Sequence, residues 1–260
     1  RPEFTRIVAS AGWSYKWGVQ QQRSQHRIDL LDINYLYMPS IDQTFKEDYL
    51  EKDENYILKY NYEDRFIVRT GYSYIYNSAG RALMNNSGIG NSYTIRLNFE
   101  SAANLLYAVA KLGGMKKNAS GEYTLLNIPF AQYLKGDFDF AKNLVIDNRN
   151  SLAFHFGAGI AIPYGNATML PFEKRYFSGG ANSVRGWSVR DLGPGSFPGD
   201  NNFMNQSGDI KLDASIEYRT RLFWKFRGAL FVDAGNIWTI RDYKDQPGGQ
   251  FEFDKFYKQI

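Results

Sequence analysis

The chain has 260 residues, of which 17% are aromatic, and a formal net charge of only +4. It contains no run of about 18 apolar residues, which argues against a transmembrane helix, and no cysteine, which excludes a disulfide framework and a thiolate metal site. Basic and acidic residues alternate, so nucleic-acid binding is not indicated. Residues 1–3 are not a signal peptide, so we expect a mature chain or a fragment.

Many aromatic residues and 24 glycines favour a transmembrane β-barrel, whose strands bury only every second residue in lipid. Apolar side chains alternate with polar ones in about eight segments, several of them near the ~9–11 residues that a tilted membrane strand needs. These segments are 4–19, 27–37, 65–77, 92–100, 128–140, 151–163, 209–219 and 227–238. A soluble β-sandwich is the alternative, but it would have to expose a second face that carries Arg, Lys and Asp.

The connections between these segments alternate in length. Short turns are expected at 20–25, 147–150 and 220–225, and a turn-like segment at 78–91. The long connections are 39–64, 101–126 and 164–208. We expect a short helix near 45–52 in the first of them, and the second begins with a sequence typical of a helix. Outer-membrane barrels have short periplasmic turns and long extracellular loops. We therefore expect all three long connections on the outside of the cell.

The segment 171–195, within the connection 164–208, is too polar and too rich in glycine for a strand or a core helix. It contains Lys174, Arg175, a Gly179-Gly180 pair and the run Val184-Arg185-Gly186-Trp187. A loop this long in a strand-rich chain is usually functional or disordered. We expect an ordered loop that packs against negative charge, with a solvated surface loop as the alternative.

Two acidic residues in the strands after this loop are candidates for that negative charge. Glu217 has the polar parity of its strand, and Asp233 lies between apolar Val232 and Ala234, so both are expected to face the barrel lumen. A guanidinium has five fixed donors, which suits Arg185 to bridging two carboxylates. Gly186 would let the loop approach the wall closely. The alternative is three unrelated solvated charges.

Three features together resemble the BamA/TamA superfamily of outer-membrane assembly and translocation barrels. They are Val-Arg-Gly-aromatic in a long loop, a glutamate in the following strand, and Phe-x-Asp-x-Gly in the strand after that. Residues 170–187 and 231–238 are most similar to BamA-like and TamA-like proteins of Bacteroidota. The resemblance covers essentially the whole chain. It implies that the motif Val184–Trp187 is the tip of a lumen-inserted loop, and that Arg185 pairs with Glu217 and Asp233, next to Gly235. Trp187 is a departure, because the family more often has Phe or Tyr there.

The family's barrels have about sixteen strands and follow periplasmic POTRA domains. The resemblance therefore implies that residues 1–260 are part of one C-terminal barrel domain, and that the POTRA domains and the terminal gate strands lie outside this chain. It also implies a location in the bacterial outer membrane, which the chain would cross several times.

The leading functional hypothesis is a non-enzymatic factor that inserts β-barrel proteins into the outer membrane. The partners implied are nascent outer-membrane proteins, outer-membrane lipid with lipopolysaccharide, and accessory assembly subunits, but no nucleic acid. A translocation pore of the same superfamily is the alternative, and a passive porin or a barrel enzyme is disfavoured. We expect no cofactor and no metal, because the two histidines, His26 and His155, mark no such site, His155 is expected only to pack, and 85–90 reads as a turn.

Overall fold

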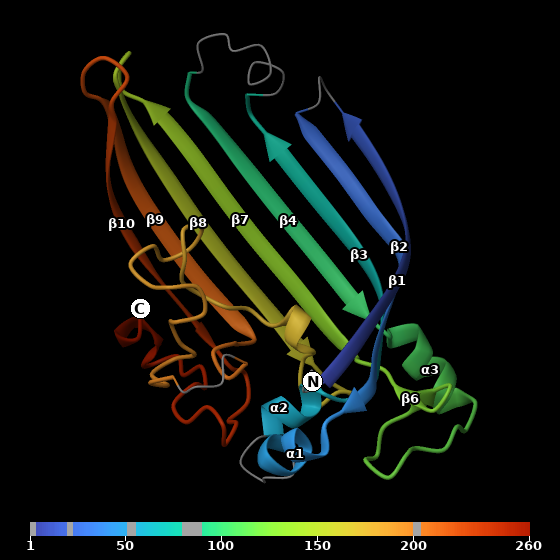
Figure 1. Cartoon of the computed structure of the whole chain (residues 1–260). Coiled ribbons are helices and arrows are strands. Elements are labelled where there is room, and N and C mark those ends of the chain that lie inside the picture. Colours follow the sequence, from blue (N-terminus) through green and yellow to red (C-terminus); the bar gives the residue numbers. More distant parts are fainter. Residues whose placement is uncertain (1–3, 20–22, 51–55, 80–89, 200–203) are drawn as a thin grey trace.

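The computed structural model describes residues 4–19, 23–50, 56–79, 90–199 and 204–260, which form one large antiparallel sheet. Eight long strands lie side by side in the order β1-β2-β3-β4-β7-β8-β9-β10 (Figure 1). They are β1 Phe4–Val19, β2 Ser24–Ile41, β3 Arg65–Asn77, β4 Ser92–Ala102, β7 Tyr133–Val145, β8 Asn150–Pro163, β9 Ile210–Arg221 and β10 Arg227–Trp238. The predicted all-β class and the eight strands are confirmed.

The two faces of this sheet differ in chemistry. One face, here called the outer face, exposes large apolar side chains, among them Phe99, Phe156, Ile216 and Val232. The opposite, inner face carries the charged residues, including Glu217 and Asp233. An apolar face that is exposed along strand after strand is what the wall of a membrane barrel presents to lipid.

A β-bulge in β2 interrupts the simple alternation. Asp29 and Asp32 pair with Gly71 and Arg69 of β3, so that Leu30 and Leu31 together oppose a single residue. Both leucines are exposed, while both aspartates lie on the inner face beside the Arg69 guanidinium. The bulge therefore lets two acids of opposite parity share one cation.

The strand predicted at 128–140 is wrong at both ends. Ile128–Pro129 (β6) pairs instead with Thr124–Leu125 (β5) in a separate hairpin. Phe130 is buried among the connections, and β7 begins only at Tyr133, opposite Ala102 of β4. Pro129 has no N–H to donate to a central ladder, which explains why the long strand begins after it.

The short helix predicted near 45–52 is present, beginning at Gln43, and a second short helix that was not predicted follows it. The structure has α1 at Gln43–Phe45, a π turn (η1) at Lys46–Leu50 and α2 at Tyr56–Asn61, while residues 51–55 lie outside the described chain. The helical texture predicted after residue 101 corresponds to α3, Asn104–Leu112. Short 3-10 turns lie at Phe172–Lys174 and Phe256–Lys258. Among the described residues, no helix is both long and apolar enough to cross a membrane.

All three long connections lie at the same end of the sheet (Figure 1). At the other end, the predicted turn at 147–150 is closed by Asp147, which accepts from the backbone N–H groups of Arg149 and Asn150. The turn predicted at 20–25 is described only from residue 23, and 80–89 of the turn-like segment, including most of the 85–90 turn, lies outside the described chain.

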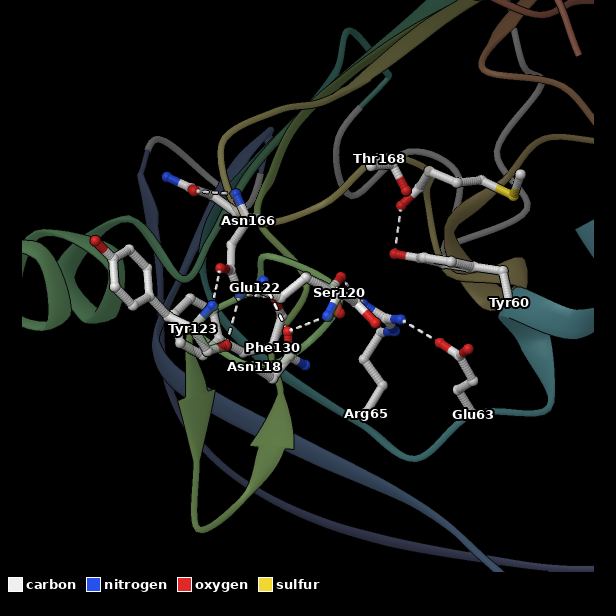
Figure 2. A network of polar contacts seen from close by, with 12 residues as sticks. Tyr60, Glu63, Arg65, Asn118, Ser120, Glu122, Tyr123, Phe130, Asn166 and Thr168 are labelled. Carbon is white, nitrogen blue, oxygen red and sulfur yellow. Dashed lines mark hydrogen bonds and ion pairs between the residues drawn. The ribbon is translucent and has the colours of Figure 1, made fainter. Parts of the chain in front are cut away.

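Buried polar contacts tie the long connections to one another (Figure 2). Arg65, at the start of β3, donates to Glu63 and to Glu122, and its Cζ lies 4.0 Å from the centroid of the Tyr60 ring. The Tyr60 hydroxyl donates in turn to the Met169 carbonyl at 2.7 Å. The three long connections therefore pack against one another at one end of the molecule. This packing fixes the point where the connection 164–208 leaves β8.

Candidate functional site

The connection 164–208 is held near its beginning by Asn166. The side-chain amide of Asn166 donates to the carbonyls of Tyr123 and Phe130, both at 2.9 Å, and its backbone N–H donates to Gln132. Asn166 is buried, so these hydrogen bonds are shielded from water. From this point the chain runs back over the sheet, in front of β8–β10 in Figure 1.

A first set of contacts fastens the loop to β4 and β7. The Lys174 ammonium lies 2.7 Å from Glu100 of β4, and the Lys174 carbonyl accepts from Lys135 of β7 at 3.1 Å. The Tyr176 hydroxyl donates to Asp137 of β7 at 2.5 Å. Burial, together with the hydrogen bond to Asp137, raises the pKa of the Tyr176 hydroxyl above its ordinary value. Neither Lys174 nor Tyr176 was assigned a partner from the sequence.

A second set of contacts centres on Arg185. Its Nε and Nη2 donate to the two carboxylate oxygens of Asp233, each at 2.7 Å, and its backbone N–H donates to the same carboxylate at 3.0 Å. Nη1 forms an ion pair with Glu217. The structure thus brings together the three charges that strand parity selected, by means of a forked guanidinium.

The surroundings of this ion pair are only partly open to water. The Asp233 side chain is 4% exposed, Glu217 15% and Arg185 23%. The hydrogen bonds that Arg185 donates to Asp233 and Glu217 raise the pKa of its guanidinium, which therefore stays charged. Removing Arg185 would leave the two neighbouring carboxylates without their shared cation, a loss that costs more the less water reaches them.

Phe231 is a part of the site that sequence reasoning missed. The Arg185 Cζ lies 3.6 Å from the centroid of the Phe231 ring, close enough for a cation–π contact. Phe231 is two residues before Asp233, so both side chains lie on the inner face of β10. The spacing Phe-x-Asp could have predicted this contact, since it places an aromatic ring and a carboxylate on the same face of one strand, where a single guanidinium can contact both.

The remaining motif residues have different surroundings. Val184 is buried, whereas Trp187 is 49% exposed. The expected role of Gly186 is wrong: a Cβ there would meet no atom within 4 Å, and Gly186 has no positive φ. A glycine is required instead at Gly179, with φ +96° and Ser188 O only 2.0 Å from a would-be Cβ, and at Gly235, where Leu212 O would be 2.7 Å away.

The two histidines lie on different parts of the sheet. The Nδ1 of His26 is 2.8 Å from the Tyr72 hydroxyl, and its ring stacks on Trp17 with centroids 5.0 Å apart. His155 does more than pack, contrary to expectation. Its Nε2 lies 2.6 Å from Asp139, and its Nδ1 3.4 Å from Asp213. The inner face therefore contains acid–base pairs beyond those that bind the loop.

Comparison with known proteins gives a consistent assignment. Residues 2–255 match the model of the Omp85 superfamily domain. A stretch of 96 residues is 32% identical to the "Outer membrane protein assembly factor BamA" of Neisseria meningitidis serogroup B (strain ATCC BAA-335 / MC58), and this covers 34% of the chain and 12% of that relative.

Two solved structures match most of this chain. BamA from Haemophilus ducreyi lacking POTRA domains 1–3 superimposes with a TM-score of 0.56 at 17% identity, over 91% of this chain and 43% of that one. CdiB from Escherichia coli gives a TM-score of 0.49 at 13% identity, over 94% and 36% of the two chains. The chain thus spans less than half the length of these relatives, and the likeness to the Haemophilus protein shows a β-barrel fold.

Proposed function

The chain belongs to the Omp85 superfamily, and from this premise we propose that it is part of an outer-membrane barrel that inserts other β-barrel proteins into the bacterial outer membrane. The observation that carries the proposal is the 32% identity to a protein named as an outer-membrane protein assembly factor. The proposed clients are nascent outer-membrane proteins, and the proposed surroundings are outer-membrane lipid, lipopolysaccharide and accessory assembly subunits.

In this proposal the connection 164–208 is a loop inserted into the barrel lumen, with Arg185 as its anchor. Three donors of Arg185 reach Asp233 and a fourth reaches Glu217, so one side chain joins the loop to two neighbouring strands. The loop would keep β9 and β10 in a fixed relation while client strands pair with strand edges elsewhere in the barrel. No covalent step is involved, and the binding of strands supplies the driving force.

The test is depletion of the full-length protein in its own bacterium, followed by complementation. Heat-modifiable mobility of resident outer-membrane barrels reports how many are folded, and a large exported protein in the medium reports translocation. The assembly role predicts that folded barrels decline first, and that the wild-type gene restores them. A translocation pore, the other role found in the superfamily, predicts loss of the exported protein while the resident barrels stay folded.

Variants of the anchor refine this test. Arg185→Ala is expected to restore folded barrels poorly although the variant itself is present in the membrane. The matched control is Arg149→Ala, which removes an exposed arginine from the short turn at the opposite end of the sheet. If Arg185→Ala restores folded barrels as well as the wild type does, then assembly does not need the Arg185 anchor, and that part of the proposal is wrong.

A further inference from the structure

Helix α3, Asn104–Leu112, presents an uncovered apolar stripe. Leu105, Val109 and Leu112 are spaced at i, i+4 and i+7, which places them on one side of the helix. They are 77%, 59% and 89% exposed, respectively. The other side packs inward through buried Ala110 and through Tyr107, whose ring lies 5.5 Å from that of Tyr123.

The helix lies at the level where a membrane-facing strand ends. Phe99 of β4 is exposed on the outer face, and Leu105 follows it by six residues, so their Cα atoms are at most about 20 Å apart. Figure 1 shows α3 at the margin of the molecule, away from α1 and α2, which pack among the other connections. Helix α3 therefore begins at the rim of the sheet, two residues after β4 ends at Ala102.

The only charged residues between Glu100 and Glu122 are basic, and these two glutamates are paired with Lys174 and Arg65. Residues 101–121 contain Lys111, Lys116 and Lys117 and no aspartate or glutamate. All three lysines are exposed, and the Lys117 ammonium lies 5.1 Å from the centroid of the Tyr123 ring. A short amphipathic helix with lysines beside an exposed leucine face, and with tyrosines at its base, has the composition of a segment that lies in a membrane interface.

We propose that α3 lies flat in the headgroup region of the leaflet on the side of the long connections. The stripe Leu105, Val109 and Leu112 would face the acyl chains, and Lys111, Lys116 and Lys117 would contact anionic headgroups. The membrane is the occupant that fits best, because α3 begins at the rim of the lipid-facing wall and because its flanking charge complements an anionic surface. This inference rests on the barrel fold and does not depend on the assembly role.

Lipid-depth quenching in the full-length protein tests the proposal. The described chain has no cysteine, so single cysteines at Leu112 and, as a control, at exposed Ala119 can carry an environment-sensitive fluorophore. The protein is reconstituted into vesicles of phosphatidylcholine, with or without phosphatidylglycerol, that contain lipids brominated near the headgroup. Heat-modifiable mobility verifies that each variant is folded.

We expect several-fold stronger quenching by brominated lipid at Leu112→Cys than at Ala119→Cys, together with a blue-shifted emission. Phosphatidylglycerol is expected to increase the quenching at position 112, and replacing Lys111, Lys116 and Lys117 by Gln is expected to abolish that increase. Equal, weak quenching at both positions would overturn the proposal. A label at 112 that is protected from both lipid and aqueous iodide would also overturn it, since a protein would then cover the stripe.

Discussion

The carboxylate of Asp233 accepts both from the guanidinium of Arg185 and from the backbone N–H of the same residue. This double attachment fixes the loop at the level of the main chain as well as through a side chain. A long flexible arginine alone would tolerate several positions of the loop. The additional backbone hydrogen bond fixes one of them, and the Phe231 ring covers the guanidinium from one side.

The two acids at Arg185 are predicted to contribute unequally. Asp233 is nearly enclosed and accepts three hydrogen bonds from Arg185, so Asp233→Asn is expected to cost about 3 kcal/mol of unfolding free energy, as for a broken buried pair. Glu217 has a second ion pair, in which the Nε of the exposed Arg219 lies 2.6 Å from its carboxylate. Because this part of the site is more open to water, Glu217→Gln is expected to cost about 1 kcal/mol of unfolding free energy. Urea unfolding of the full-length variants in detergent measures both. Equal costs would contradict this ranking.

The contacts of Lys174 and Tyr176 are predicted to hold the first half of the loop independently of Arg185. Combining Lys174→Met with Tyr176→Phe removes the ion pair to Glu100 and the hydrogen bond to Asp137 while keeping most of the side-chain volume. Labelling of a cysteine at buried Ser178 should become faster in this variant than in Arg185→Ala. Lys244→Met, at an exposed lysine, is the control. Unchanged labelling of Ser178→Cys would show that these contacts do not hold the loop.

Neighbouring positions of β8 are predicted to differ in their tolerance of charge. Phe154 belongs to the apolar row of the strand, and Ala153 to the row that contains His155. Phe154→Arg is expected to cost about 2–4 kcal/mol if the position is near the bilayer midplane, whereas Ala153→Arg avoids the lipid penalty. Cysteines at the two positions, treated with a water-soluble thiol reagent, should label only at 153. Equal labelling would contradict a membrane wall with two distinct faces.

The end of the sheet that carries the long connections is predicted to face the cell exterior. Epitope tags inserted in 39–64 or 101–126 should be reached by antibodies on intact cells, because these segments lie at that end. Tags in 20–25 or 220–225 should require permeabilised cells. The reverse pattern would invert the topology and would place the connection 164–208 on the periplasmic side.

Strand alternation was sufficient to predict most of the wall. β1, β3 and β10 have the predicted bounds, because one face of each strand is almost entirely apolar or aromatic at every second position. The alternation fails at Leu30-Leu31, where a bulge changes the parity, and at Pro129, where a hairpin competes with the strand. In both places the backbone departs from the period of two on which the prediction depends.

The site could be predicted where its residues lie on strands or belong to the loop motif. Parity placed Glu217 and Asp233 on the same face, and the motif then indicated Arg185 as their partner. The partners of Lys174 and Tyr176 could not be predicted, because the path of an irregular loop depends on tertiary contacts that no periodicity reports. The close approach of the loop to the wall that was attributed to Gly186 is made instead at Gly193, where a Cβ would lie 2.3 Å from Asn236 of β10.

The central claim is that Arg185 holds the loop on the inner face, and the exposure of Val184 reports it most directly. Val184 is buried beside the anchor, whereas Trp187 is half exposed, so cysteines at the two positions form a matched pair. In full-length protein in native membranes, a water-soluble maleimide should label Val184→Cys slowly. Arg185→Ala should speed this labelling several-fold, and Arg185→Lys, which cannot fork to two acids, should speed it less. Labelling of Trp187→Cys should change little. If Val184→Cys reacts equally fast with and without Arg185, the guanidinium does not hold the loop.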